Sequence, residues 1–294
     1  MAIRITQNQL ASQFTNDVNS IYTKLARSQQ QVADGRRITK PSDDPFGTGQ
    51  VLGCDRQLED TRRYQSNVTD SISFLNAADS ALDSVTSALQ KIREKTLQAQ
   101  NGSNGPADRA SIALEIQQLK EVVRDGMNAQ YGDTYVFGGT ATTAAPYGGP
   151  GNNYAGNANT MSRRIGPNQS VQINVAGTSV LGPNGTNTLD AIDQLVLDIT
   201  AGNNAGMSTG ATAIVAATDQ ALNMRTQLGA TTSRLETLQS RLDLTEERLL
   251  AARSEVADVD GAEAYMEFQQ HQTMYQAALA AGTRIMQTSI LDFI

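Results

Sequence analysis

Side chains that could perform acid–base or metal chemistry are few, and the strongest group is a pair of adjacent carboxylates. Asp43 and Asp44 lie inside the stretch Pro41-Ser42-Asp43-Asp44-Pro45. Paired acids can act as general acid and base or bind a metal ion. An Asp directly before a proline is also a helix-start signal, with Asp as the N-cap and Pro at the first helical position. Because no other ligand cluster is nearby, we interpret Asp44 as a helix cap.

The remaining reactive residues are isolated from one another. His271 lies among Gln269, Gln270 and Gln272, which predicts a solvated helix face rather than a general base. Cys54 is the only cysteine, which excludes an intramolecular disulfide and favours a small packed residue. The glycine pairs of the middle segment lack the strand–loop–helix spacing of a nucleotide-binding loop. We therefore expect no enzyme activity, no cofactor and no metal site.

Charge and hydropathy exclude two further classes of partner. A net charge of −7 and a pI near 4.8 argue against nucleic acid, because phosphate binding requires clustered cations. The pairs Arg36-Arg37 and Arg163-Arg164 are predicted to be solvated surface. No apolar run approaches the roughly 20 residues needed to cross a membrane. The N-terminus lacks the pattern of a cleaved secretory signal.

The elements that hold these residues are mostly helices with a seven-residue repeat. An apolar residue recurs every seven positions from Leu228 to Val256, which is typical of a coiled-coil seam. After Asp260-Gly261 the phase changes, and a second apolar stripe continues to the C-terminus. Residues 51–99 repeat in the same way, as one long helix or a pair. The residues predicted to form the core of these helices are Leu75, Leu82, Leu89, Leu235, Leu242 and Leu249.

Two more helices are predicted in the N-terminal half. Residues 7–33 form an amphipathic helix that ends at Asp34-Gly35. The dense turn signal of residues 101–106 separates the long repeat from a helix over residues 107–130.

The middle of the chain has a different character. Residues 138–210 hold 13 of the 24 glycines, which is unlike a helical bundle. Val171–Val175 alternates as a strand does, and Met161–Ile165 is its expected partner across a short turn. A short helix over residues 189–199 is opened by Asn187 or Thr188, and residues 203–210 are expected to be a loop.

These elements predict a mainly α fold with an inserted β region. Both terminal regions would form a long antiparallel coiled-coil rod, with a small β-rich domain at its far end. The expected parts are 1–40 (N-terminal helix and loop), 41–130 (first half of the rod), 131–210 (glycine-rich β module), 211–260 (second half of the rod) and 261–294 (C-terminal helix).

Several motifs resemble the bacterial flagellin superfamily. Ile3-Arg4-Ile5 and the stretch from Asp34 through Pro41-Ser42-Asp43-Asp44-Pro45 resemble its opening. The motif over residues 135–140 resembles the exit from its helical part, and residues 289–293 resemble its ending. Within this superfamily, the Pro-Ser-Asp-Asp-Pro box resembles the hook-associated members, which join the hook to the filament. Flagellin itself is the alternative.

The resemblance implies a structural subunit exported unfolded through the flagellar type III apparatus, without a cleaved signal, to the extracellular flagellum. It implies that identical subunits form a ring between hook-associated protein 1 and flagellin. It also implies a flagellar export chaperone as a partner. Heptads alone also allow a cytosolic coiled-coil adaptor. Apolar seams at both ends would need a neighbour to cover them. The residues expected at this assembly interface are Phe14, Val18, Ile21, Leu25, Tyr275, Leu279, Met286, Ile290 and Phe293.

Overall fold

The computed structural model describes residues 7–102, 104–149 and 151–291 and divides into two compact units. Unit 1 combines the two ends of the chain, residues 1–60 and 246–294, and unit 2 comprises residues 61–245. The two ends of the sequence therefore form one unit together, and the middle of the sequence forms the other. The elements are α1 (Gln7–Asp34), α2 (Pro45–Ala99), α3 (Pro106–Met127), β1 (Gln130–Tyr131), β2 (Thr134–Tyr135), β3 (Ser162–Gly166), β4 (Gln169–Gln172), α4 (Thr178–Leu181), α5 (Thr188–Ala201), α6 (Asn204–Ala257) and α7 (Gly261–Leu291).

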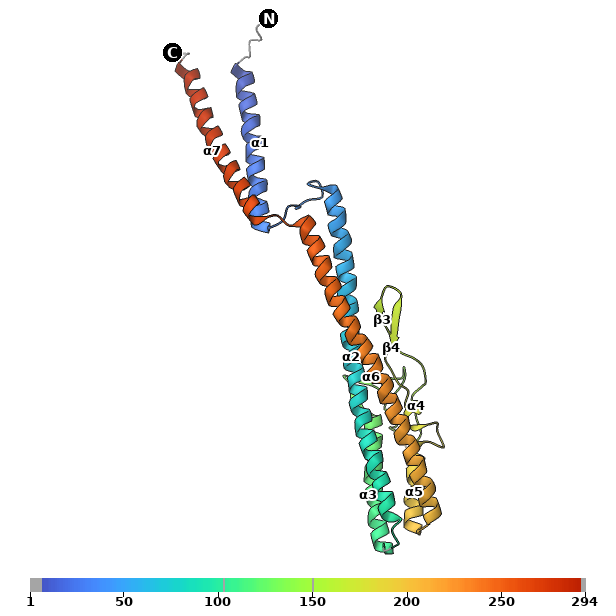
Figure 1. The fold of residues 1–294 in the computed structure, drawn as a ribbon. Helices are drawn as coiled ribbons and strands as arrows, with labels where there is room; N and C mark the ends of the chain where they lie inside the picture. Colours follow the sequence, from blue (N-terminus) through green and yellow to red (C-terminus); the bar gives the residue numbers. More distant parts are fainter. Residues whose placement is uncertain (1–6, 103, 150, 292–294) are drawn as a thin grey trace. The chain divides into compact units, whose positions relative to one another are not determined.

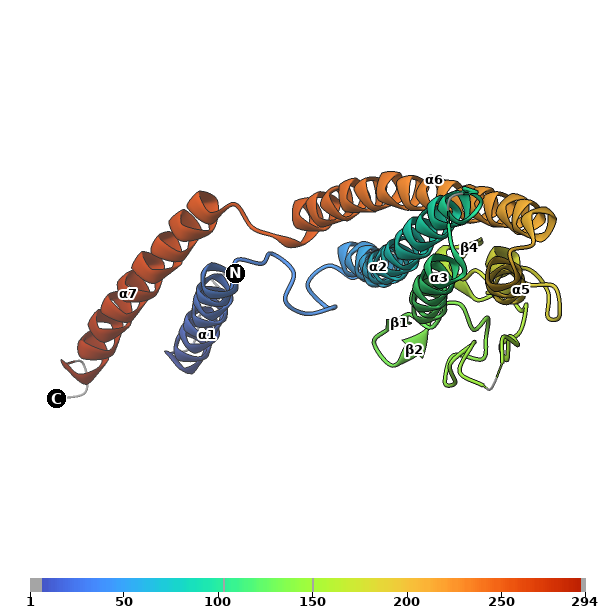
Figure 2. The same ribbon diagram turned by 90° about the horizontal axis from the view of Figure 1, so that it is seen from below.

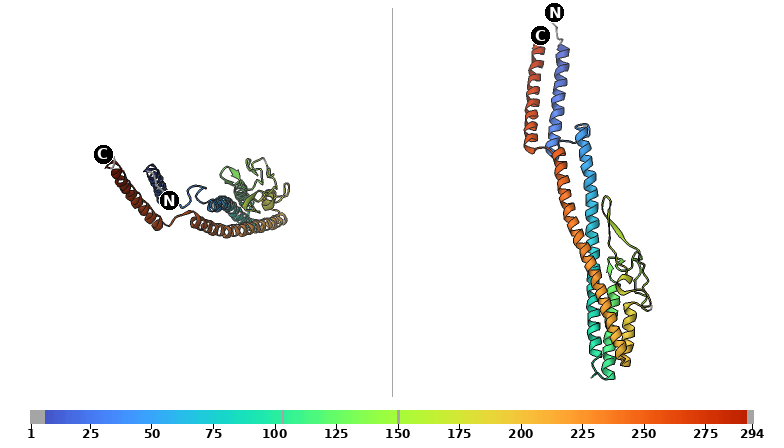
Figure 3. Two further views of the ribbon diagram at one scale, coloured as in Figure 1. Left: turned by 90° about the horizontal axis from the view of Figure 1, so that it is seen from above. Right: turned by 45° about the vertical axis from the view of Figure 1, so that its right-hand side comes forward.

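Within unit 2, α2 and α6 run antiparallel, as the views of Figures 1 and 3 show. Polar side chains bond the two helices in a constant register, in which a rising residue number on α2 meets a falling number on α6. α2 is one continuous helix and begins at Pro45, six residues earlier than the repeat indicated. The bonds join Gln65 to Asp243 (2.8 Å), Thr69 to Gln239 (3.2 Å), Asp79 to Arg225 (2.9 Å) and Asp83 to Arg225 (2.6 Å).

Five of the six predicted core positions lie in the core of this unit. Leu75, Leu82 and Leu89 of α2 are at most 1% exposed, and Leu235 of α6 is fully buried. Leu242 is also buried, whereas Leu249 is half-buried and belongs to unit 1. The view from below in Figure 2 shows α3 and α5 alongside α2 and α6. Lys120 of α3 donates to both carboxylate oxygens of Asp193 on α5, at 2.6 Å each.

The segment predicted as a loop, residues 203–210, is helical, so that prediction was wrong. α6 begins at Asn204, and the side chain of Asn203 accepts from the backbone N–H of Gly206 at 3.2 Å. A Cβ on Gly206 would lie 2.3 Å from the Asp198 carboxyl carbon, and one on Gly210 would lie 2.8 Å from Leu195. These glycines allow α5 and α6 to approach closely. In the sequence these glycines look like turn residues. Only the packing of α5 against α6 shows that they lie at a close contact between helices.

The mainly α fold with a small inserted β region is confirmed, and the strands are short. β3 and β4 form the predicted antiparallel hairpin, with Arg163 opposite Val171. β4 ends at Gln172 rather than Val175, and β1 and β2 form the other two-stranded sheet. The predicted short helix is α5, and Asn187 caps it by accepting from the backbone N–H of Asp190 at 3.0 Å.

The glycine-rich stretch between the sheets is ordered by side chains rather than by strands. The Tyr154 hydroxyl lies within hydrogen-bond distance of the carbonyls of Phe137 (2.8 Å) and Asn157 (2.9 Å), which share its single proton. Its ring contacts that of Tyr147, with centroids 5.5 Å apart. Burial raises the pKa of both tyrosine hydroxyls. Arg163 pairs with Asp70 at 2.7 Å while its side chain stays 42% exposed, so it lies at the surface as predicted and has a partner there.

Candidate assembly surface

The two ends of the chain meet as an antiparallel helix pair inside unit 1. α1 and α7 lie side by side over their lengths (Figures 1 and 3). On each helix the less exposed residues follow alternating spacings of three and four, which is the seam of a two-stranded coiled coil. The seam residues are Phe14, Val18, Ile21, Leu25 and Ser28 on α1, and Ala264, Phe268, His271, Tyr275, Ala278 and Gly282 on α7.

Small residues let the two helices approach closely. Ala264 is 2% exposed, and a Cβ placed on Gly282 would lie 2.2 Å from the ring of Phe14. The ring of Tyr275 contacts that of Tyr22, with centroids 5.8 Å apart. The seam therefore has no room for a larger side chain at position 282.

The structure brings together five of the nine predicted interface residues. Phe14, Val18, Ile21, Leu25 and Tyr275 are half-buried on the seam. The predicted partner Leu279 is instead 44% exposed, one residue from the seam position Ala278. The side chains of Met286 and Ile290, and all of Phe293, lie outside the residues that the structure describes.

Apolar side chains also remain on the outer surface of this helix pair. Tyr22, Tyr265 and Met266 are each more than half exposed. Of the large apolar side chains recorded as exposed among described residues, nine belong to unit 1 and six to the larger unit 2. Exposed apolar surface concentrated in one part of a protein marks an interaction site. Unit 1 is thus the candidate assembly surface.

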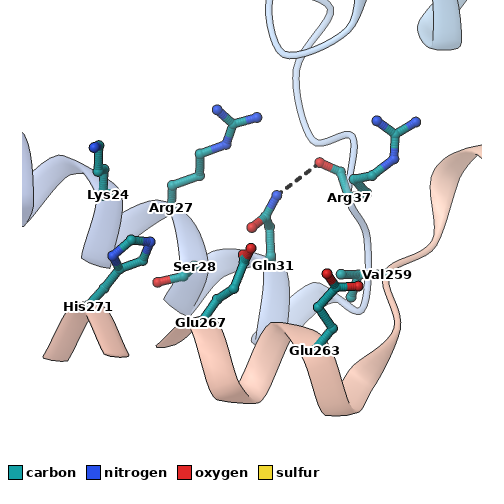
Figure 4. Close-up of a pocket in the computed structure, with 9 residues that line it drawn as sticks. All are labelled: Lys24, Arg27, Ser28, Gln31, Arg37, Val259, Glu263, Glu267 and His271. Atoms are coloured by element: carbon teal, nitrogen blue, oxygen red, sulfur yellow. Dashed lines mark hydrogen bonds between the residues drawn. The ribbon is translucent and has the colours of Figure 1, made fainter. Parts of the chain in front are cut away.

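The polar end of the seam encloses a hollow of about 400 Å³ between α1 and α7, shown in Figure 4. Its lining includes Lys24 and Arg27 of α1 and Glu263 and Glu267 of α7, and Arg27 pairs with Asp43 at 3.5 Å. Gln31 donates to the carbonyl of Arg37 at 3.1 Å. Mixed charges of both signs do not define a site for a single ion.

His271 lies in this hollow, which corrects its assignment to a solvated face. It is half-buried at a seam position, and its Nδ1 is buried with no hydrogen-bond partner among the described residues. The alternating spacing from Ala264 to Gly282 was the sequence signal that could have placed it. No group of three or more metal-ligating His, Cys, Asp or Glu side chains occurs in the described part of the chain.

The loop between α1 and α2 is held by the two adjacent carboxylates. Asp44 caps α2, since its Oδ1 accepts from the backbone N–H of Gly47 at 2.9 Å, and the capping interpretation is confirmed. Asp43 accepts from the backbone N–H groups of Lys40 (3.0 Å) and Thr39 (3.2 Å) and from the Thr39 hydroxyl (3.0 Å). These donors favour the charged carboxylate.

The hydrogen bonds determine the direction of both pKa values. The backbone N–H of Lys40, followed by the Thr39 hydroxyl, lowers the pKa of Asp43 below its usual value. The backbone N–H of Gly47, followed by Arg37, lowers the pKa of Asp44. Both groups act as structural anions of the loop.

The same loop is joined to the segment between α6 and α7. The backbone N–H of Arg37 donates to the carbonyl of Ala257 at 2.8 Å, and that of Val259 donates to Gly35 at 3.1 Å. The Arg37 guanidinium donates to Asp44 (3.2 Å) and to the carbonyl of Val256 (2.9 Å). Arg37 therefore contributes to this junction while its side chain stays 48% exposed, which agrees with the prediction of solvated surface.

Two helical regions from opposite ends of the sequence, separated by a glycine-rich insert, pair with each other in this fold. This arrangement defines a class of helical proteins built from paired terminal regions. The model of the bacterial flagellin N-terminal helical region matches residues 5–142, and that of the C-terminal helical region matches residues 211–294. The chain belongs to the bacterial flagellin family.

Similar proteins agree with this family. Flagellar hook-associated protein 3 of Escherichia coli is 25% identical, covering 99% of both chains, and flagellin FlaB1 of Treponema pallidum is 26% identical, covering 92% of both. A Vibrio parahaemolyticus protein described as a flagellar hook-associated protein has the same fold (TM-score 0.69, 22% identity, 74% of this chain and 100% of that one). None of the described helices is long and apolar enough to span a membrane.

Proposed function

We propose that this chain is the structural subunit that joins the flagellar hook to the filament. It forms a ring of identical subunits that contacts hook-associated protein 1 on one side and flagellin on the other. The observation that carries the proposal is the exposed apolar surface of the paired terminal helices. Full-length similarity to a hook-associated protein 3 supports it.

The physical reason for assembly is the apolar area that a neighbouring copy would cover. Complete burial of a large apolar side chain contributes about 1.5–3 kcal/mol, so covering one that is half exposed contributes roughly 1 kcal/mol. Tyr22, Tyr265, Met266, Met274 and Leu279 are between 43% and 64% exposed on the terminal pair. Several such contacts repeated around a ring would offset the loss of rotational and translational freedom.

The location of the subunit follows from the same proposal. The chain is exported through the flagellar type III apparatus, bound to an export chaperone beforehand, and resides in the external flagellum. Neither step requires an enzymatic activity of its own.

A flagellin filament subunit is the second candidate. Its support is the similarity to flagellin FlaB1, which covers nearly as much of the chain. The Pro-Ser-Asp-Asp-Pro loop favours the junction subunit, as the family resemblance implies.

A complementation experiment separates the two candidates. The chain is expressed in a bacterium that lacks its own hook-associated protein 3, and in parallel in one that lacks flagellin. Restored filament attachment in the first strain only is the expected result. Filaments composed of this chain in the second strain would refute the junction proposal in favour of the filament subunit.

A truncation lacking residues 285–294 tests the role of the terminal pair. We expect it to remain a folded monomer and to be missing from isolated flagella. Incorporation at the full-length level would contradict the proposed role of the C-terminal helix.

A further inference from the structure

An aromatic side chain stands almost fully exposed at the start of α2. Phe46 follows Pro45 in the first helical turn and is 78% exposed, the highest value among the exposed large apolar side chains recorded. The cap of this helix is supplied by Asp44 alone. Neither capping nor packing within the chain accounts for a phenylalanine here, and an exposed aromatic residue is the usual anchor of a contact.

The helix surface beside Phe46 is bare. At 100° per residue, Gly49 and Gly53 lie within about 60° of Phe46 around α2. A Cβ added to either glycine would meet no atom within 4 Å. Relative to alanine, each glycine destabilises the helix by about 1 kcal/mol, and neither glycine makes a packing contact inside the chain in return. Two such glycines next to an exposed ring permit the close approach of another chain.

A hollow that suits an aromatic ring lies on the other side of the same helix. It measures about 120 Å³, comparable to the roughly 150 Å³ of a cavity that accepts benzene. Its α2 residues, Thr48, Val51 and Leu52, lie about 120–160° around the helix from Phe46. Leu52 is itself 55% exposed. The remaining lining residues are Arg36, Ile38, Thr39, Lys40, Pro41, Arg253 and Ala257.

The cations at the rim complement an aromatic ring. Within the described part of the chain, the side chains of Arg36 and Lys40 make no hydrogen bond or ion pair. Arg253, by contrast, pairs with Asp55 at 2.9 Å. Cations bind the face of an aromatic ring. A second copy of this chain brings such a ring, its own Phe46.

We propose that Phe46 of one copy inserts into the hollow of the next copy, and that Leu52 of that copy covers Gly49 and Gly53 of the first. Because ring and hollow lie on opposite sides of α2, a copy that donates its ring keeps its own hollow free. Such a head-to-tail contact propagates around a ring instead of closing a dimer. This inference rests on the proposed function and identifies the lateral contact between subunits.

Crosslinking of assembled flagella tests the contact directly. Two chains are co-expressed in the strain lacking hook-associated protein 3, both with Cys54→Ala and with Phe46 retained. One carries an epitope tag and Gln50→Cys, at an exposed position about 40° around α2 from Phe46, and the other carries Leu52→Cys. Mild oxidation of isolated flagella should give a tagged heterodimer at least about tenfold above the homodimers of either variant alone. Heterodimer at the homodimer level, with both chains present in the flagella, would overturn the contact and leave the junction function standing. Absence of even the unsubstituted chain from the flagella would overturn both.

Substitutions separate this contact from folding. Phe46→Ala should leave the melting temperature of the monomer unchanged and lower incorporation about tenfold or more, the effect expected for losing one buried aromatic side chain. Gly49→Ala with Gly53→Ala should raise the melting temperature yet lower incorporation. Gly229→Ala is the matched control, because it is a glycine of α6 with equally open space, in unit 2. It should raise the melting temperature and leave incorporation unchanged. Incorporation of the double variant at the control level would overturn the proposal.

Discussion

Gly282→Ala should weaken the pairing of α1 with α7, although alanine is the better helix former. On propensity alone the substitution stabilises a helix by about 1 kcal/mol. The new methyl group, however, would start 2.2 Å from Phe14 Cζ and 2.6 Å from its Cε1, well inside contact distance. Forcing a packed ring to move costs about 1–3 kcal/mol. The net expectation is a loss of roughly 1 kcal/mol in the free energy of opening of the helix pair.

Native-state hydrogen exchange on the purified full-length chain measures this effect. The amides of α1 and α7 should exchange about fivefold faster in Gly282→Ala, the factor for a loss of about 1 kcal/mol. The amides of unit 2 should not change. Gly229→Ala serves as the control for propensity alone, since open space surrounds its Cβ position, and it should slow exchange in α6.

A second substitution tests whether contact between the new methyl group and Phe14 causes the weaker pairing of α1 with α7. Phe14→Leu shortens the side chain that the new methyl group meets, so the double variant should be more stable than the sum of the two single effects. Slower exchange of α1 in Gly282→Ala alone would show that the helices are not in close contact at this point. The account of the seam would then be wrong.

Three further predictions concern the core, a cap and the loop. Leu82→Ala in α2, where the leucine is fully buried, should lower the free energy of unfolding of unit 2 by about 2–5 kcal/mol in a denaturant titration. Asn187→Ala should cost about 0.5–2 kcal/mol in the same assay, because the cap of α5 is lost, while Asn187→Asp should retain most of the stability. The lowered pKa of Asp43 means that its stabilisation is fully present above the usual carboxylate pKa near 3.8 and is lost as the pH falls through its lower folded value. Asp43→Asn should therefore remove part of the acid sensitivity of amide protection in residues 35–44, and an unchanged pH profile would contradict this role.

Periodicity predicted the long helices because their cores are made of large apolar residues at constant spacing. Leu75, Leu82 and Leu89 repeat every seven residues and are all buried. The hairpin was equally accessible, since strand alternation flanks a strong turn at Pro167-Asn168. In both cases the local sequence pattern agrees with the tertiary packing, so these elements could be predicted from the sequence.

The seam between α1 and α7 was harder to predict because small residues occupy three of its six positions on α7. The bulky residue Leu279 was predicted to lie at the interface, yet it is 44% exposed. Ala264 and Gly282 lie on the contact instead, since a close helix pair leaves little volume between its backbones. Hydrophobicity ranks side chains by size and cannot indicate that the smallest ones face the partner.

Glycine illustrates the same limit and shows what the structure adds. Gly210 and Gly282 both lie in helices, where a Cβ would strike a neighbouring side chain of the same unit, so each serves contacts within the chain. Gly49 and Gly53 are helical too, but nothing lies near them. A helix that tolerates two poor helix formers beside the exposed ring of Phe46 gains nothing from them as a monomer. Open space alone does not indicate a contact, since Gly229 has it as well. Gly49 and Gly53 differ because they lie beside the exposed ring of Phe46, and this combination supports a contact with another molecule, for which the hollow on the opposite side of α2 makes a second copy the partner that fits.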